Sequence, residues 1–155
     1  MVSKTLSSYT KITNFIKEGI MPISTRWYDD NHKVIFQLFE GNWTWADLSR
    51  EQERMRIMAE SVPYKVILFS DMSQTSFMPQ GNVLSQGRAA FAKLPNNIAQ
   101  IVIAIQSRMI EVFTNIAIDM VPTWRKRVKF VKTVEEAQKV VAEALATNTT
   151  GTGAA

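Results

Sequence analysis

The chain contains no cysteine and a single histidine, His32. The lack of cysteine excludes disulfide bonds, thiolate catalysis and cysteine-based metal sites, and one histidine argues against a histidine-ligated zinc site or a Ser-His-Asp triad. No apolar run reaches the roughly 18 residues that cross a bilayer. The N-terminus also lacks the apolar core of a secretory signal. We therefore expect a cytoplasmic protein with no catalytic residues, metal, cofactor or transmembrane segment.

The composition is that of an ordinary globular protein, with 46% hydrophobic and 21% charged residues in a chain of 155. Its net charge is +4, much of it in the run Arg125–Arg127 with Lys129 and Lys132 behind. Such a run is either a solvated loop and strand edge or a patch that attracts acidic partners and anionic surfaces. A nucleic-acid reader needs more basic surface or a recognisable aromatic module, so we expect no nucleic acid among the partners.

Strand and helix patterns alternate along the chain. Apolar runs predict strands at residues 23–28, 34–39, 64–70, 98–105 and 128–131, and helical spacing predicts helices at about 44–62, 82–94, 107–121 and 133–146. The order ββαβαβαβα predicts an α/β fold with a mixed, mainly parallel sheet of about five strands, an N-terminal hairpin and helices packed on its faces. We expect one domain at 23–146, a poorly ordered or loosely packed segment at 1–22 and a disordered tail at 147–155.

Local signals fix several of these boundaries. Thr44 is followed by Asp47, and Thr133 by Glu136, which predicts a capping box at the start of two helices. Turn chemistry in residues 29–32 predicts a hairpin between the first two strands. On the first helix, apolar positions predict a buried stripe of Leu48, Met55, Ala59 and Val62, with Arg50, Glu51, Glu53 and Arg54 facing water.

Three stretches of the chain resemble the SpoIIAA-like branch of the STAS family. They are Gly41 with Trp43–Leu48 after a strand, the buried strand Val66–Asp71 that ends in an acid, and the closing strand Arg127–Val131 followed by Thr133–Ala137. The likeness spans about residues 23–145. It implies a non-catalytic, bacterial-type regulatory module that works by binding protein partners. STAS proteins of this kind switch partners by phosphorylation of a serine, but Pro79 and Gln80 stand where this motif would lie. We therefore expect the module to lack the phosphorylatable serine.

The loop from Asp71 to Gly81 is the expected recognition site, because ligands of open α/β sheets favour the carboxyl ends of the strands. Its candidate interaction residues are Asp71, Ser73, Thr75, Phe77 and Met78. Asp71 either has a functional role, orienting the loop or accepting a hydrogen bond from a ligand, or it caps the backbone N–H groups of Ser73 or Gln74. The loop hydroxyls are either phosphate acceptors or ordinary turn residues.

The helix at 107–121 has an apolar surface wider than a surface helix needs. Met109 and Phe113 are its candidate interaction residues, and Ile118 falls on its polar side. Two interpretations remain open. The helix is well buried, for instance under the N-terminal segment, or it exposes an apolar strip for a homodimer, another partner or a lipid-like ligand.

Trp124 and Arg125 complete the candidate interaction residues. The indole either packs into the core or, beside its cationic neighbours, forms a membrane-interface or anion-binding surface. Across the whole chain, a regulatory interaction module is the first functional hypothesis. A carrier of a small apolar or lipid-like ligand is the alternative, and it requires an enclosed apolar cavity of a few hundred Å³.

Overall fold

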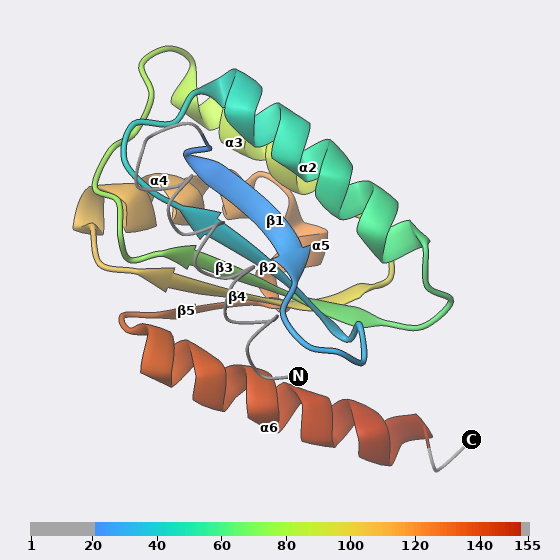
Figure 1. Cartoon of the computed structure of the whole chain (residues 1–155). Helices are drawn as coiled ribbons and strands as arrows, with labels where there is room; N and C mark the ends of the chain where they lie inside the picture. The colour runs from blue at the N-terminus through green and yellow to red at the C-terminus, as the bar shows by residue number, and fades with distance from the viewer. Residues whose placement is uncertain (1–20, 153–155) are drawn as a thin grey trace.

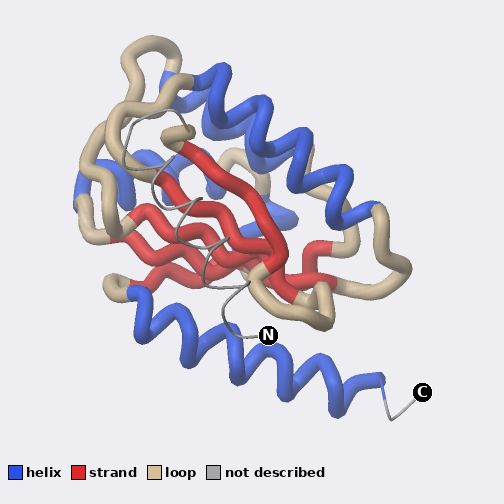
Figure 2. Tube along the Cα trace, viewed as in Figure 1, coloured by secondary structure: helices blue, strands red, loops and turns tan. Residues whose placement is uncertain are grey.

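Five strands form one mixed sheet in the order β1-β2-β3-β4-β5 (Figures 1 and 2). The structure is a computed structural model and describes residues 21–152. The strands are β1 (Ile23–Trp27), β2 (Val34–Phe39), β3 (Val66–Met72), β4 (Ile98–Ile105) and β5 (Val128–Val131). β1 pairs antiparallel with β2, and all other neighbours pair parallel. The predicted α/β fold, with a hairpin leading into a mainly parallel sheet, is confirmed.

The helices divide unequally between the two faces of the sheet. They are α2 (Trp45–Glu60), α3 (Val83–Ala92), α4 (Arg108–Asp119), α5 (Pro122–Arg125) and α6 (Val134–Thr152). Figure 1 shows α2, α3 and α4 on one face and α6 on the other. The parallel strands follow one another across the sheet, so successive right-handed crossovers place their helices on the same face. Among the described helices, α6 covers the opposite face, because it follows the last strand.

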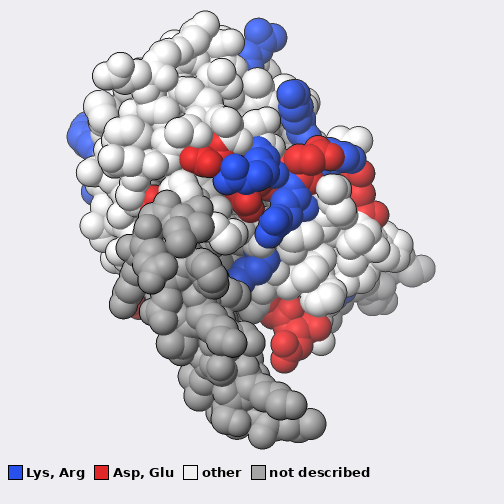
Figure 3. Space-filling model, turned by 45° about the horizontal axis from the view of Figure 1, so that its top comes forward, with Lys and Arg blue, Asp and Glu red and all other residues white. Residues whose placement is uncertain are grey.

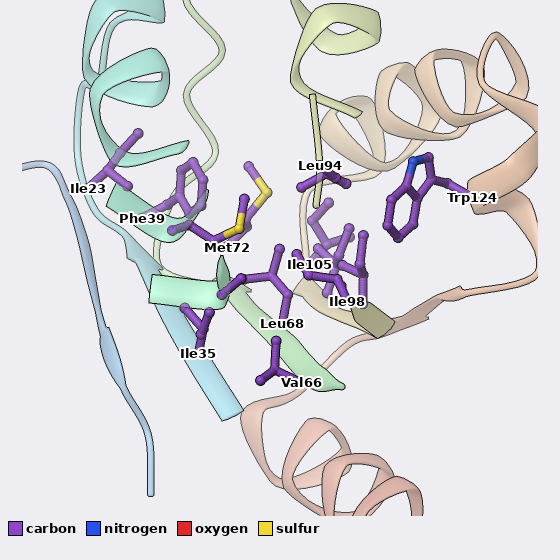
Figure 4. Packing of buried hydrophobic residues seen from close by; sticks show 14 of the residues in the cluster. Ile23, Ile35, Phe39, Val66, Leu68, Met72, Leu94, Ile98, Ile105 and Trp124 are labelled. Carbon is purple, nitrogen blue, oxygen red and sulfur yellow. The ribbon is translucent and has the colours of Figure 1, made fainter. Parts of the chain in front are cut away.

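Each face of the sheet has its own apolar core. The larger core lies under α2, α3 and α4 and includes Leu68, Ile101, Ile103 and Trp124; Figure 4 shows its side chains converging from the strands and helices. The smaller core centres on Phe69 and packs against Ala137 and Val141 of α6. β3 and β4 contribute alternate residues to both cores, which explains their near-continuous apolar sequence.

Several element boundaries differ from the predictions by a few residues, and three of these differences change an element's extent or neighbour. β3 continues to Met72, two residues beyond the predicted strand. The helix predicted at 107–121 ends at Asp119 as α4, and Pro122 begins the short helix α5, since proline is tolerated in the first turn. α6 continues to Thr152, so the first part of the predicted tail at 147–155 is helical. The predicted segment at 1–22 lies outside the described residues except for its last two positions.

The predicted hairpin turn is confirmed in detail. Asp29 Oδ1 accepts hydrogen bonds from the backbone N–H groups of Lys33 and Val34, both at 2.9 Å. His32 takes a positive φ of 53° and stacks its ring on Trp27, with centroids 4.6 Å apart. The single histidine therefore has a structural place in the turn.

The first capping box is complete and the second is formed in part. Thr44 Oγ1 accepts from the Asp47 backbone N–H at 3.0 Å, and Asp47 Oδ2 accepts from the Thr44 backbone N–H at 2.9 Å. At the start of α6, Thr133 Oγ1 accepts from Glu136 N–H, but the Glu136 carboxylate accepts from Lys132 N–H. Burial raises the pKa of Asp47, but hydrogen bonds from Thr44 and the Arg50 guanidinium outweigh it and hold the pKa below its ordinary value.

We expect Thr44→Ala to lower the free energy of unfolding by about 1 kcal/mol, because the backbone N–H of Asp47 loses the Thr44 hydroxyl that accepts its hydrogen bond. Thr44→Ser keeps the acceptor and should stay within a few tenths of wild type. Ionised Asp47 contributes to the free energy of unfolding at pH values above its pKa in the unfolded chain. This contribution is lost as the pH falls through its lower pKa in the folded protein. Urea unfolding at fixed protein concentration checks both points. An equal loss for alanine and serine would contradict the role of the cap.

Candidate functional site

A cavity of about 100 Å³ lies between the sheet and the helices α2, α3 and α4. Its walls come from strands β2, β3 and β4, from the three helices and from the loop before α3. The lining residues are Gln37, Phe39, Trp43, Trp45, Leu48, Gln52, Leu68, Ser70, Met72, Met78, Val83, Gly87, Ala90, Phe91, Leu94, Ile101, Ile103, Phe113, Thr114 and Ala117. Most of these side chains are apolar. The few polar side chains are therefore the groups that could form hydrogen bonds with a small ligand.

A polar row crosses the sheet beneath this cavity. In the strand register Thr25 pairs with Gln37, and Gln37 pairs with Ser70, so the three side chains share one face. All three are buried. The Gln37 amide donates to Thr25 Oγ1 at 3.3 Å, to the Glu51 carbonyl at 3.4 Å and to Gln52 Oε1 at 3.2 Å. Gln37 therefore ties β1 and β2 to α2 at the cavity.

Trp43 contributes a buried donor to the same region. Its side chain is 3% exposed, and its Nε1 finds no acceptor among the described residues. The ring packs edge-on against Phe39 and Trp45, with centroids 5.5 and 5.2 Å away. The unpaired N–H is costly in this environment, since a buried donor without an acceptor has lost its water.

The loop predicted as the recognition site covers one end of the cavity. Trp45 Nε1 donates to the Gln80 carbonyl at 3.0 Å, and Met78 lines the cavity. Thr75 is buried and its hydroxyl donates to the Gly41 carbonyl at 3.0 Å while accepting from Phe77 N–H at 3.1 Å. Thr75 therefore holds the loop in place and is a poor candidate for a surface contact.

Asp71 and Ser73 form a local unit away from the cavity. Asp71 is 5% exposed and lies in β3 on the face of Phe69, opposite the cavity. Its Oδ1 accepts from the Ser73 backbone N–H at 2.9 Å and from the Ser73 hydroxyl at 2.6 Å. The capping interpretation of Asp71 is thus the one the geometry matches. Of the loop residues predicted for interaction, Phe77 is the large apolar one left exposed, at 37%.

Both interpretations of the apolar surface of α4 hold, each for a different part of the helix: some of its apolar side chains are buried and others are exposed. Four large apolar side chains are exposed on it: Met109, Val112, Ile116 and Met120, the last at its C-cap. Ile118 is fully buried, contrary to its expected place on the polar side, because that side turns toward the sheet. Phe113 lines the cavity and is part-buried, so it does not belong to the exposed stripe with Met109.

Trp124 is a core residue. It is 5% exposed, and Figure 4 shows its ring turned toward Ile98 and Ile105. Arg125 is exposed and bonds within its own surroundings, donating to Asn115 Oδ1 at 2.8 Å and lying 3.3 Å from Asp119 Oδ1. The core interpretation of Trp124 is confirmed. These two residues also do not line the cavity.

Glu51 corrects the predicted exposed face of α2. Its side chain is 1% exposed, with guanidinium nitrogens of Arg50 and Arg54 at 3.6 and 3.9 Å. Figure 3 shows charges of both signs interspersed on the face that includes α2. Glu51 lies three residues after Leu48 and four before Met55, so helical spacing places it on the buried stripe. The prediction of an exposed Glu51 was wrong because it relied on the charge of the side chain instead of this spacing.

In the comparisons with known proteins, no family model, curated protein or solved structure matches this chain. Among residues 21–152, no helix is both long and apolar enough to span a membrane. The cavity and the α4 stripe are therefore the features from which a function can be argued.

Proposed function

We propose that this protein is a non-catalytic, STAS-type interaction module and that its partner binds the exposed stripe of α4. The observation that carries the proposal is the exposure of Met109, Val112, Ile116 and Met120, which are 53%, 48%, 40% and 44% accessible. Their spacing places them on one line along the helix. Four large apolar side chains in one exposed row are typical of a surface that another protein covers.

A second copy of the chain fits this stripe. Met109 and Met120 lie at nearly equal distances on either side of residue 114, and Val112 and Ile116 lie two residues on either side of it. When two copies of α4 pair antiparallel about a two-fold axis, each methionine meets the other methionine and each valine meets an isoleucine. The stripe is thus complementary to itself in one register.

The flanking charges match the same arrangement. Arg108 begins α4 and Asp119 ends it, about three helical turns apart and therefore on the same flank of the stripe. Antiparallel pairing places Arg108 of one copy opposite Asp119 of the other, twice in the dimer. Asp119 also lies near Arg125 of its own chain, which would share the interaction. Such rim pairs mainly fix the register of an interface.

The size of the cavity favours this proposal over a lipid carrier. Pockets that enclose drug-sized ligands measure roughly 300–1,000 Å³, and this cavity is about 100 Å³. The loop that would carry the STAS phosphorylation site also suits a module without that switch, because Pro79 is buried and the Gln80 carbonyl is bonded to Trp45.

Sedimentation equilibrium of the full chain across the micromolar range tests the proposal. We expect a wild-type dimer and a dissociation constant raised about a hundredfold or more by Ile116→Glu, which places a charge in the apolar interface. Ile57→Glu is the matched control, because Ile57 is 57% exposed on α2, outside the stripe. A monomeric wild type, or equal effects of the two variants, would overturn the proposal.

A charge reversal tests the register. Arg108→Glu and Asp119→Arg should each weaken the dimer by about three- to tenfold, and the double variant should recover most of the loss. Circular dichroism of each variant confirms that the monomer remains folded. A dimer in which the double variant is as weak as the sum of the singles would contradict antiparallel α4 pairing.

A further inference from the structure

We propose that the outer edge of β5 binds an extended acidic segment of a partner protein, which pairs with β5 as a further strand of the sheet. In the strand order β5 comes last, and it pairs with β4 on its inner side (Figure 1). Its other side is therefore an edge of the sheet. This edge consists of other residues than the exposed stripe of α4, so the inference goes beyond the proposed interaction function.

The backbone of β5 presents hydrogen-bonding groups along this edge. Ile101 N–H donates to the Arg127 carbonyl at 2.8 Å, which fixes the phase of the parallel ladder between β4 and β5. In that pattern Lys129 turns its N–H and C=O groups toward β4, whereas Val128 and Phe130 turn theirs away. Among residues 21–152, no group bonds these outward N–H and C=O groups. An extended peptide can pair with them, as in β-strand addition.

The charge along the edge sets the chemistry of the partner. Residues 125–132 contain five basic residues and no acidic one. Lys126, Lys129 and Lys132 are exposed, and none of them forms an ion pair with a carboxylate of the described part of the chain. Glu136 bonds the backbone N–H of Lys132 and not its ammonium group. An acidic segment would therefore meet positive charge that nothing described here compensates.

The two faces of β5 ask for different side chains in the incoming strand. Lys129 pairs with Val102 and lies on the face of α6. Val128 and Phe130 lie on the other face, where both are only partly buried against the larger core. A strand with acidic residues on the Lys129 side and apolar residues on the other side matches both faces.

A second copy of β5 fits this edge poorly. In an antiparallel pair of two β5 strands, the outward groups of Val128 in one copy would bond those of Phe130 in the other. Lys129 would then lie directly opposite Lys129 of the second copy, and like charges in that position are destabilising. Lysine on an edge strand discourages pairing between identical edges. The same lysine favours an acidic strand, so the partner is an acidic segment and not this chain.

A peptide that alternates glutamate and valine is the probe, and amide shifts of the ¹⁵N-labelled full-length protein report its binding. A peptide that alternates lysine and valine is the control, and we expect saturable binding of the glutamate peptide only. Lys129→Glu should weaken this binding about tenfold or more. Lys93→Glu changes the net charge equally but lies exposed at the C-cap of α3, so it should weaken binding less than about twofold.

Two N-methylated forms of the glutamate peptide test strand pairing, because both keep every side chain and every carboxylate. In antiparallel pairing the valines lie opposite Val128 and Phe130 and donate the hydrogen bonds, whereas in parallel pairing the glutamates donate them. Methylation of one set of residues should therefore abolish binding, and methylation of the other set should leave most of it. The set that abolishes binding gives the direction of the bound strand.

Hydrogen exchange locates the peptide on the protein. In the free protein the amides of Lys129 and Val131 should exchange slowly, because they bond β4, and those of Val128 and Phe130 should exchange fast. The bound peptide should protect Val128 and Phe130. The titration is repeated in Ile116→Glu, where binding of the peptide should persist even though the α4 dimer is lost.

Three results would overturn the inference. Equal binding of the two N-methylated peptides would show charge attraction without strand pairing. Unchanged exchange of Val128 and Phe130 at saturating peptide would place the peptide elsewhere. Vesicles of phosphatidylserine and phosphatidylcholine are the remaining probe. Lys129-dependent binding of these vesicles, together with no binding of the peptide, would assign the lysines to a membrane surface.

Discussion

Phe69→Ala is expected to lower the free energy of unfolding by about 3–5 kcal/mol, the range for removing a buried phenylalanine. Phe69 is fully buried in the middle of β3. Its ring lies edge-on to Phe36 and Tyr28, with centroids 4.9 and 5.5 Å away. Its loss leaves a void at the centre of the smaller core. Within residues 21–152, α6 is the helix that packs on this core, so the void lies between the sheet and that helix.

Phe77→Ala is the matched control, because Phe77 is 37% exposed in the loop before α3. It should cost well under half as much. Urea unfolding at one protein concentration, followed by tryptophan fluorescence and circular dichroism, measures both variants. Equal losses would mean that the smaller core is not a main source of stability.

The order of elements followed from the sequence because local signals and the global fold agree. Buried strands appear as continuous apolar runs, and the turn at Asp29 and the cap at Thr44 are made by neighbouring residues. Interactions of such short range leave a direct trace in the sequence. The same reason explains Asp71, whose carboxylate bonds Ser73 two residues away.

Side-chain exposure was harder to predict, because it depends on distant elements. Glu51 is a charged residue of a type usually found on surfaces, but its position in α2 falls on the buried stripe. In the structure it is buried, as its position indicates. The sequence placed Ile118 on the polar side of its helix. In the structure Ile118 is buried, because the sheet and the neighbouring helix determine which side of α4 faces inward. Trp124 is a further case, since its place in the core became clear only from the packing of α5 against the sheet.

The cavity left only weak signals in the sequence. Gln37 interrupts the apolar run of β2 at an inward position, and Ser70 ends the predicted third strand. Either polar residue could have indicated a turn or a surface patch. Only the strand register aligns them, and only the packing of α3 on α4 leaves space above them. The sequence predicted an apolar strip on α4. It could not show that Phe113 lines the cavity while Met109 is exposed, because that difference depends on where the cavity lies.

The contact between α3 and α4 leads to a prediction whose sign depends on one neighbour. Gly87 lies in the middle of α3, where alanine would normally stabilise the helix by about 1 kcal/mol. A Cβ added there would lie 2.9 Å from the Ala117 Cβ, which α4 holds in place. The clash should exceed the gain in helix propensity. We therefore expect Gly87→Ala to destabilise the protein by about 1–2 kcal/mol.

Removing the opposing methyl group should reverse the sign. In an Ala117→Gly background the space is open, and Gly87→Ala should then stabilise the protein by about 0.5–1 kcal/mol. Urea unfolding of the two single variants and the double variant gives the coupling energy, and Ser85→Ala, exposed on the same helix, measures propensity alone. If Gly87→Ala had the same sign in both backgrounds, Ala117 would not be what requires glycine, and the close crossing that shapes the cavity would need another explanation.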